Sequence, residues 1–323
     1  MSRRKAFIFG IYGQDGYYLS KLLLGHDYEI VGTFHKSNYH KQSKFEEIGI
    51  ETNICDIRDK DRVSQLLSKF NPHEVYNLAG ISSVVDSWYD PTPYIETNSI
   101  GVLNILNALT DKSLNLGSAR FFQASSSEMF GDTGLIPANE DRYMAPRSPY
   151  AVSKLVSHQF IGMYREKYNC FLTSGILFNH ESPLRNQNFL SKKITTGVVK
   201  VLKGESEKIM LGNLEIRRDW SFAGDIVQAA WSMLQQPVPM DYVLASGESK
   251  TVQNFVEVAF DYVGIKNWRR HVQVNEKLIR SNEAKIVEGN PAKARINLNW
   301  KPRYSFEDMI KVLIDDELKN QVK

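Results

Sequence analysis

Short apolar runs alternate with helical patterns along the first half of the chain. Runs typical of buried strands are expected at residues 6–9, 28–34, 74–78 and 120–124. Between them apolar residues recur with helical spacing, which predicts helices at 59–70 and 97–109 and one that carries Leu19, Leu22 and Leu23. Strands that alternate with helices of this length predict βαβ units and a parallel sheet, because strands buried on both faces read as continuous apolar runs.

The pattern loosens after residue 178. Residues 179–189 are polar and contain proline, which indicates a surface loop. Helices are expected near 190–203, 225–236, 252–263 and 305–318, with a strand at 242–245. We therefore predict an α/β fold: a Rossmann-type doubly wound parallel sheet with a smaller C-terminal α/β substrate-binding region, and a ligand cleft between them.

Composition and charge exclude several classes of protein. The chain has 323 residues, enough for about two domains, and a formal net charge of +3, too low for a dedicated nucleic-acid binder. Its apolar runs are shorter than the roughly 18 residues of a membrane span, and the run after the basic N-terminus is too short for a signal peptide. With only Cys55 and Cys170, we expect no disulfide scaffold and no metal site, and we predict a cytoplasmic protein.

Three glycines follow the first predicted strand and open the first helix. Gly10, Gly13 and Gly16 are spaced at i, i+3 and i+6. In this context the first permits a tight turn, the second a close approach of a pyrophosphate, and the third close packing of the helix. The pattern predicts a dinucleotide site at the helix N-terminus, with an ordinary strand-to-helix turn as the alternative.

The end of the second strand indicates which dinucleotide is bound. Residues 33–37 contain no carboxylate to hold the ribose hydroxyls, and Lys36 is placed to neutralise a 2′-phosphate. This favours NADP over NAD; the alternative is that His35 and Lys36 are solvated loop charges. Asp56, after a third short strand, is expected beside the adenine, although its spacing equally fits a helix cap.

A tyrosine and a lysine follow a helix start signal. Ser148 is a good N-cap and Pro149 suits the first helical position, so Tyr150 and Lys154 are expected one turn apart on one helix face. A nearby ammonium lowers the pKa of a tyrosine, which would make Tyr150 a base for a sugar or alcohol hydroxyl while Lys154 holds the cofactor ribose. The alternative is an exposed helix pair.

Serines and a carboxylate lie at the end of the strand at 120–124. Active sites of open α/β sheets form at such strand ends. Ser126 is expected to donate a hydrogen bond to the hydroxyl that Tyr150 deprotonates, and Glu128 to serve as an acid and base. A serine-rich turn and a surface charge are the alternatives.

Together these motifs resemble the extended short-chain dehydrogenase/reductase superfamily, and within it the GDP-mannose 4,6-dehydratase branch. The closest matching segments are residues 10–16, 148–151, 175–183 and 211–220, and the resemblance runs nearly end to end. It implies a GDP-sugar substrate and a reaction in three steps. Tyr150 deprotonates the 4-hydroxyl as hydride leaves C4, Glu128 removes the C5 proton as water leaves from C6, and the hydride returns to C6.

The resemblance also implies most of the remaining contacts. Asn179 would hold the diphosphate with Arg218 and Arg280, although solvated charges are the alternative for the arginines. Lys193 and the backbone at Leu190 would contact guanine, Glu283 the ribose, and Ser83 and Asn188 other parts of the substrate. The further expected cofactor contacts are Gln14, Asp15, Ile57, Leu78 and Ala79.

The chain departs from the branch at residues 182–186, 79–83 and 35–44. Gly80 and Ser83 replace larger residues, which favours a bulkier sugar: GDP-N-acetylglucosamine is our preferred substrate, ahead of GDP-mannose, with GDP-heptose also possible within the branch. In the branch, the loop at 35–44 reaches the neighbouring subunit's cofactor, and its altered sequence here argues against that contact and so against a tetramer. The helices near 97–109 and 150–166 often pair in this superfamily, so a homodimer or homotetramer is expected.

Two other functions stay open. A same-fold epimerase or ketoreductase would need Tyr150 and Lys154 but not Glu128, and a cofactor-sensing protein would perform no chemistry. We expect residues 1–178, with a returning segment near 219–247, to form the NADP-binding Rossmann domain. Residues 179–218 and 248–323 would form the nucleotide-sugar-binding domain.

Overall fold

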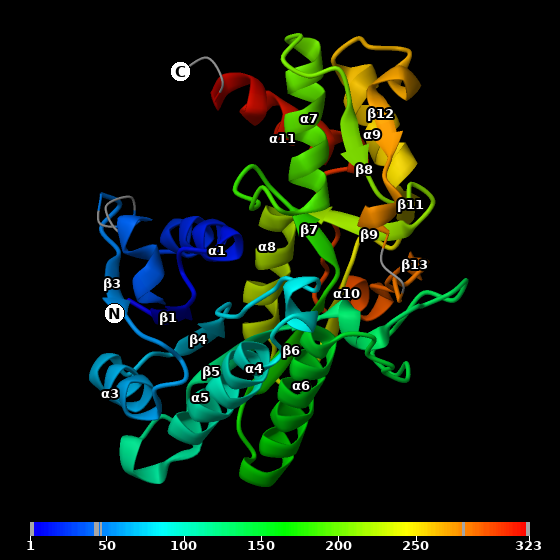
Figure 1. Ribbon diagram of the computed structural model, residues 1–323. Helices are drawn as coiled ribbons and strands as arrows, with labels where there is room; N and C mark the ends of the chain where they lie inside the picture. The colour runs from blue at the N-terminus through cyan, green and yellow to red at the C-terminus, as the bar shows by residue number, and fades with distance from the viewer. Residues whose placement is uncertain (1–2, 42–44, 46, 280–281, 321–323) are drawn as a thin grey trace.

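Seven parallel strands form the central sheet, in the order β10-β6-β5-β4-β1-β2-β3. The computed structural model describes residues 3–41, 45, 47–279 and 282–320. Figure 1 shows the sheet in the lower half of the molecule. The strands are β1 (Lys5–Phe9), β2 (Glu29–Phe34), β3 (Glu51–Ile54), β4 (Glu74–Asn77), β5 (Arg120–Ser126), β6 (Leu172–Leu177) and β10 (Tyr242–Leu244). The predicted α/β fold with a doubly wound parallel sheet is confirmed.

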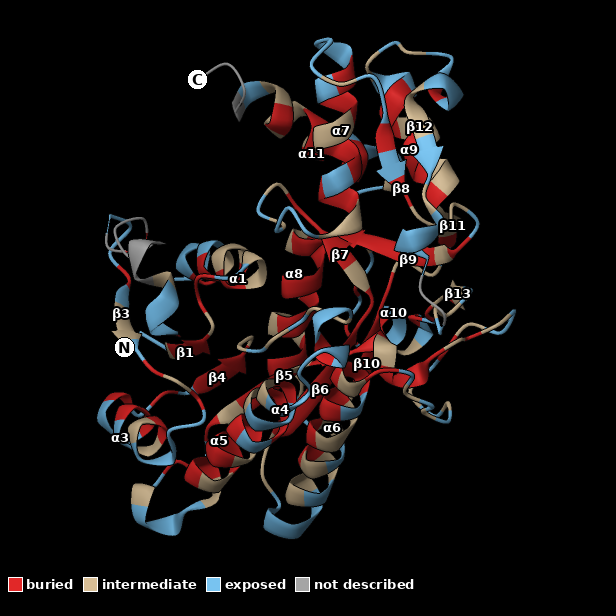
Figure 2. Cartoon of the chain, in the orientation of Figure 1, coloured by how far each residue is buried: buried red, intermediate tan, exposed pale blue. Residues whose placement is uncertain are grey.

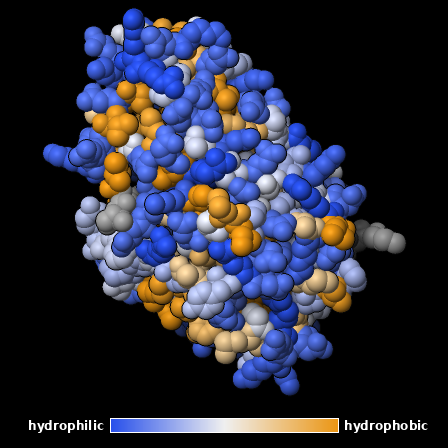
Figure 3. All heavy atoms as spheres, turned by 90° about the vertical axis from the view of Figure 1, so that its right-hand side faces the viewer, coloured by the Kyte–Doolittle hydropathy of each residue, from blue (hydrophilic) through white to orange (hydrophobic). Residues whose placement is uncertain are grey.

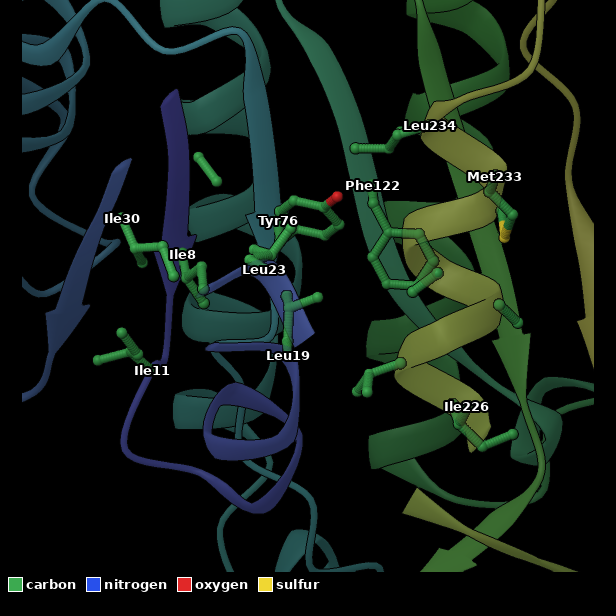
Figure 4. Packing of buried hydrophobic residues seen from close by; sticks show 14 of the residues in the cluster. Ile8, Ile11, Leu19, Leu23, Ile30, Tyr76, Phe122, Ile226, Met233 and Leu234 are labelled. Atoms are coloured by element: carbon green, nitrogen blue, oxygen red, sulfur yellow. The ribbon is translucent and has the colours of Figure 1, made fainter. Parts of the chain in front are cut away.

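Helices cover both faces of this sheet. Alternate residues of a strand point to opposite faces, so Ala6 and Ile8 of β1 join one core, and Phe7 and Phe9 join another. The first core lies under α1 (Gln14–Gly25) and α8 (Ala223–Leu234), as the labelled side chains of Figure 4 show. The second lies under α3 (Lys60–Phe70), α5 (Gly101–Thr110) and α6 (Pro149–Tyr168). In Figure 2 the inner strands of this sheet are almost entirely buried, whereas the edge strand β3 and the outer faces of the helices are not.

Helix α6 begins where the sequence predicts. The Ser148 hydroxyl accepts a hydrogen bond from the backbone N–H of Ala151, 3.1 Å away, and Pro149 occupies the first turn. The helix ends at Asn169, which adopts the left-handed conformation that asparagine tolerates. The cap places Tyr150 at the very start of the helix, where its side chain faces the carboxyl end of β5.

The C-terminal part of the chain has a core of its own. It packs α7 (Leu190–Leu202), α9 (Val252–Tyr262) and α11 (Phe306–Asn320) against short strands. β9 (Arg217–Phe222) pairs with β7 (Asn179–Glu181), β11 (Ser249–Thr251) and β13 (Ile286–Val287), while β8 (Ile209–Leu211) pairs with β12 (Val272–Val274). These elements form the upper half of Figure 1, above the carboxyl ends of the large sheet.

Several local predictions were wrong. The loop expected at 179–189 begins with strand β7, whose polar residues pair with β9. The helix expected at 97–109 starts earlier, with α4 (Thr92–Ile95) and a π-helical turn at Glu96–Ile100 ahead of α5. A short helix, α10 (Ala292–Asn297), was not predicted either. Strands of two or three residues carry too little periodicity to be recognised, and charges in β9 hide its pairing.

The molecular surface is mixed. On the face that Figure 3 shows, apolar residues lie in small groups among hydrophilic ones. Within the described part of the chain, no helix combines the length and the apolar character that crossing a membrane requires.

Candidate active site

Three adjoining cavities follow the carboxyl edge of the large sheet. The first, of about 570 Å³, lies beside the ends of β2 and β3 and shares Gly10 and Gly13 with the second. The second, of about 290 Å³, lies between the glycine loop and α6, and it shares Val84 and Glu128 with the third, of about 430 Å³. They form one continuous path at the strand ends, where ligands of open α/β sheets bind.

The glycine loop has the geometry that a pyrophosphate requires. Gly10 has φ +80°, and a Cβ there would lie 2.7 Å from the backbone nitrogen of Ala79, so only glycine fits. A Cβ on Gly16 would lie 2.3 Å from the carbonyl oxygen of Ile11, which shows how closely α1 packs on the turn. Gly13 is the N-cap of α1, and it lines the cavities together with Gln14 and Asp15. The residues present therefore fit a dinucleotide whose phosphates lie at the helix N-terminus.

The first cavity is lined by several residues that were expected at the cofactor. Its wall includes Asp56, Ile57, Leu78 and Ala79. The Arg58 guanidinium lies 2.7 Å from the Asp56 carboxylate, and this hydrogen-bonded pair holds the pKa of Asp56 below its ordinary value.

The residue predicted to read a 2′-phosphate is not on this wall. Lys36 is exposed, and the first cavity is lined instead by His35, Ser37 and Arg58 among the residues described. The Arg58 side chain also lies 2.9 Å from Glu96, so it is held between two carboxylates at the cavity mouth. Arg58, not Lys36, is the arginine or lysine on this wall among the residues described.

Ser126, Glu128 and Tyr150 meet in the second cavity. Tyr150 is buried, and its hydroxyl is hydrogen-bonded to the Ser126 side chain. The same Ser126 hydroxyl accepts a hydrogen bond from the backbone N–H of Glu128, 3.2 Å away. The charge of Glu128 acts on Tyr150, and Glu128 also lines the third cavity. A carboxylate and a phenol therefore face the same space.

The protonation of Tyr150 differs from the prediction. Burial raises its pKa to about 12, while the bond to Ser126 and the charge of Arg185 pull the pKa downwards. Lys154 is turned to the carbonyl oxygen of Ala124, 2.9 Å away, and burial lowers its own pKa to about 8 against the charge of Asp15. The expectation that Lys154 depresses the pKa of Tyr150 is wrong for this arrangement, because burial dominates.

Two residues of the second cavity were missed as site residues. His180 lies 2.9 Å from Asp15, and its ring nitrogen Nδ1 lies 2.7 Å from the carbonyl oxygen of Phe178. The Arg185 guanidinium lies over the Phe189 ring, 3.7 Å from its centre, and 3.1 Å from the Glu181 carboxylate. Both lie in the polar segment after β6, which was interpreted as a loop and compared with the branch, but neither side chain was assigned a role.

Asn179, Arg218 and Glu283 face the path of cavities from the C-terminal side. Asn179 lines the second cavity, while Arg218 and Glu283 line the third and lie 3.6 Å apart. Arg218 is buried and donates to the carbonyl oxygens of Arg217 and Ala284, each 2.9 Å away. A fixed guanidinium in a cavity wall suits a phosphate group.

Other expected substrate contacts lie elsewhere. Asn188 and Lys193 are exposed, and Leu190 packs against the C-terminal core. The Ser83 hydroxyl accepts a hydrogen bond from the backbone N–H of Asp86, 3.2 Å away, so it caps a turn. Of the residues described, none of these four lines the three cavities, and Arg280 lies outside the described residues.

Gly80 gives no spare room beside a sugar. A Cβ there would lie 2.9 Å from Oδ1 of Asn98 and 3.5 Å from Nζ of Lys154. The missing side chain would thus point towards α6 and Asn98. Gly80 therefore makes no room for a bulkier sugar, contrary to the prediction, because Asn98 and Lys154 already fill the space.

The parallel sheet, the glycine loop and the Tyr150–Lys154 site define a member of the extended short-chain dehydrogenase/reductase superfamily. The fold resembles UDP-glucose 4-epimerase of Thermotoga maritima, with a TM-score of 0.86 and 19% identity over 99% of this chain and 100% of the other. It also resembles dTDP-glucose 4,6-dehydratase of Bacillus anthracis, with a TM-score of 0.85 and 20% identity over 99% and 98%.

Sequence comparison gives the family. A sequence model of the GDP-mannose 4,6 dehydratase family matches residues 7–313. GDP-mannose 4,6 dehydratase 2 of Arabidopsis thaliana is 39% identical over 327 residues, which cover 98% of this chain and 87% of the plant protein. The human GDP-mannose 4,6 dehydratase is 36% identical over 339 residues, 97% and 91% of the two chains. The chain belongs to the GDP-mannose 4,6 dehydratase family.

Proposed function

We propose that the protein is a GDP-sugar 4,6-dehydratase and that its substrate is GDP-mannose. The observation that carries the proposal is the approach of Glu128 and Tyr150 to one cavity, since a dehydratase needs both a group for the 4-hydroxyl and a separate acid and base for elimination. Family membership supports GDP-mannose. The departures at residues 79–83 favoured GDP-N-acetylglucosamine, but Gly80 leaves no additional space for its larger substituent.

Different residues of the second cavity perform the separate proton transfers of the reaction. Tyr150 takes the proton of the sugar 4-hydroxyl, and Ser126 holds that hydroxyl in place through its hydrogen bond. Glu128 removes the proton from C5 and protonates the hydroxyl that leaves C6, so one water is lost. The proton that Tyr150 took is then returned to C5, and with hydride added at C6 a 4-keto-6-deoxy sugar remains. A nicotinamide cofactor, when bound, supplies the acceptor and donor of hydride. Because burial raises the pKa of Tyr150 to about 12, its role as a base depends on the groups that pull this pKa downwards, the Ser126 hydrogen bond and the charge of Arg185.

We propose NADP as the cofactor rather than NAD. The wall of the first cavity beyond β2 offers His35, Ser37 and Arg58, with no carboxylate directly after β2 to hold the ribose hydroxyls. Gly10, Gly13, Gln14 and Gly16 would hold the pyrophosphate, and Lys154 the nicotinamide ribose.

The C-terminal residues would hold the rest of the substrate. Arg218 would bind the diphosphate and Glu283 a ribose hydroxyl, with Asn179 between the sugar and the diphosphate. On this basis residues 1–178 with 219–247 serve the cofactor, and 179–218 with 248–323 serve the nucleotide sugar. The exposed Ile100, Val152 and Met163 support a homodimer or homotetramer paired through the helices of residues 97–109 and 150–166.

Mass spectrometry of a panel of GDP-sugars tests the proposal. The purified protein with NADP is expected to remove one water from GDP-mannose and to turn over GDP-N-acetylglucosamine at least tenfold more slowly. Preference for GDP-N-acetylglucosamine would contradict the proposed substrate, and conversion without loss of water would contradict the dehydratase assignment.

A further inference from the structure

Trp88 lies exposed on the wall of the third cavity. It ends a 3₁₀ turn at Asp86–Trp88 and keeps 58% of its surface accessible. The chain has five tryptophans, of which Trp220, Trp268 and Trp300 are buried, and Trp231 is half-buried and stacks on His26. Trp88 is thus the most exposed of the five, and it lies in the cavity that adjoins the catalytic residues.

The turn that carries Trp88 is held firmly. The Ser87 side chain is buried, and its hydroxyl donates to the carbonyl oxygen of Val84, 2.7 Å away. The backbone N–H of Trp88 donates to the carbonyl oxygen of Val85, 3.1 Å away, and Ser83 caps the turn from its other end. The exposed position of the indole is therefore set by the local backbone.

The wall of the cavity has a charged and an apolar part. Arg218 and Glu283 supply charges, and Val84, Val85, Trp88 and Tyr89, from one segment of the chain, supply aromatic and apolar surface. Glu128 lies where this cavity joins the second. A ligand with its diphosphate at Arg218 and its C5–C6 atoms at Glu128 would place the sugar ring between these two ends, along the apolar wall.

We propose that Trp88 is a substrate-positioning residue whose indole ring stacks against the hexose of the GDP-sugar. This inference rests on the proposed function for the identity of the ligand. A pyranose has hydroxyls around its edge and C–H groups on its faces, and the electron-rich face of an aromatic ring attracts such polarised hydrogens. Stacking would hold the ring plane so that C4 faces Tyr150 and C5 faces Glu128.

Tryptophan fluorescence tests whether the ligand reaches Trp88. Titration of the cofactor-loaded wild type with GDP-mannose is expected to change the emission, because Trp88 is the accessible indole on this path. The W88F variant should lose that change while its dissociation constant, measured by calorimetry, stays within about threefold, since the phenyl ring still stacks. W231F, remote from the cavities, is the matched control and should keep the change. If W88F shows the same change in emission as the wild type on titration with GDP-mannose, the proposal is overturned.

Truncation of the ring distinguishes contact with the hexose from contact with the nucleotide. W88A should weaken GDP-mannose binding about tenfold, the equivalent of roughly 1.4 kcal/mol, and should change the affinity for GDP, which has no hexose, less than twofold. The KM for GDP-mannose should rise about tenfold while kcat stays within about threefold. Y143A removes a still more exposed aromatic residue outside this cavity and should alter neither affinity. Equal weakening of GDP and GDP-mannose, or no weakening, would overturn the proposal.

Different results would contradict the stacking role of Trp88 and the proposed function. If W88A weakens GDP-mannose binding selectively but the wild type dehydrates no GDP-sugar, the stacking role stands and the proposed function is contradicted. If the wild type turns over GDP-mannose and W88A matches it in both affinity and KM, the stacking role alone is contradicted.

Discussion

The carboxylate of Asp15 lies 2.9 Å from Nε2 of His180, and this pair ties the glycine loop of the large sheet to strand β7. The side chain of Gln14 strengthens the tie, since it donates to the carbonyl oxygen of His180, 3.1 Å away, and accepts from the Ser182 hydroxyl, 2.8 Å away. The cofactor loop and the substrate-side strand are thus fixed to one another directly behind the catalytic cavity.

The Asp15–His180 pair predicts a stability difference that depends on pH. Burial alone would lower the pKa of His180, but the charge of Asp15 raises this pKa above 6.5. Burial alone would raise the pKa of Asp15, but the charge and hydrogen bond of His180 bring this pKa below 3.8. The histidine's contribution is complete below pH 6.5 and lost as pH rises through its raised pKa. The contribution of the aspartate is complete above pH 3.8 and lost as pH falls through its lowered pKa.

His180→Gln should therefore destabilise the protein most between about pH 4 and 6.5, by about 3 kcal/mol, as expected for a broken buried pair. The measurement is the free energy of unfolding of wild type and variant across pH 4–9. The same difference at pH 5 and pH 9 would contradict this role of the pair.

Glu128→Gln should abolish dehydration. Without the carboxylate, the C5 proton has no acceptor and the leaving hydroxyl no acid, so formation of the 4-keto-6-deoxy product should fall about 10²–10⁴-fold. Glu215→Gln, at an exposed position, is the matched control. Near-normal turnover of Glu128→Gln would favour an epimerase or ketoreductase instead.

Two glycines of helix α1 give a matched pair of variants. Gly16→Ala would force a methyl group to within 2.3 Å of the Ile11 carbonyl oxygen and should cost about 1–3 kcal/mol of stability and weaken cofactor binding. At Gly25, in the last turn of the same helix, no described atom would lie within 4 Å of the new methyl group. Gly25→Ala should therefore be neutral or stabilise by up to about 1 kcal/mol. Thermal unfolding and NADP titration of both variants measure the contrast, and equal losses would contradict it.

Variants of Arg58 and Lys36 test which of the two side chains contacts the cofactor. Arg58→Ala should raise the KM for NADP about tenfold and leave that for NAD within about twofold, because its guanidinium lies at the cavity wall beside Asp56. Lys36→Ala should change neither KM more than twofold. A strong and NADP-selective effect of Lys36→Ala would restore the interpretation made from the sequence.

The sequence predicted those parts of the site that depend on neighbouring residues of the chain. It failed for side chains whose position depends on the tertiary fold. Glycine spacing and the Ser148–Pro149 helix start depend on the backbone nearby, so the loop and the start of α6 were found correctly. Lys36 was expected at the cofactor because of its position after β2. In the structure Lys36 is exposed, and Arg58 lines the first cavity instead.

Electrostatics and short strands were the other weak points. Spacing indicates that Tyr150 and Lys154 share a helix face, but not how deeply the phenol is buried, and burial controls its pKa. The pairing of β7 with β9 joins residues about 40 positions apart, through segments with no apolar alternation. This strand pairing therefore could not be predicted from the sequence.

A deuterium label tests the central claim most directly. GDP-mannose carrying deuterium at C4 is incubated with the wild-type protein and catalytic NADP, and the product is examined by NMR and mass spectrometry. If Tyr150 and Glu128 act on one hexose as described, the product has lost one water and carries the deuterium at C6. A product that retains all its oxygen atoms, or one whose deuterium is absent from C6, would contradict the account.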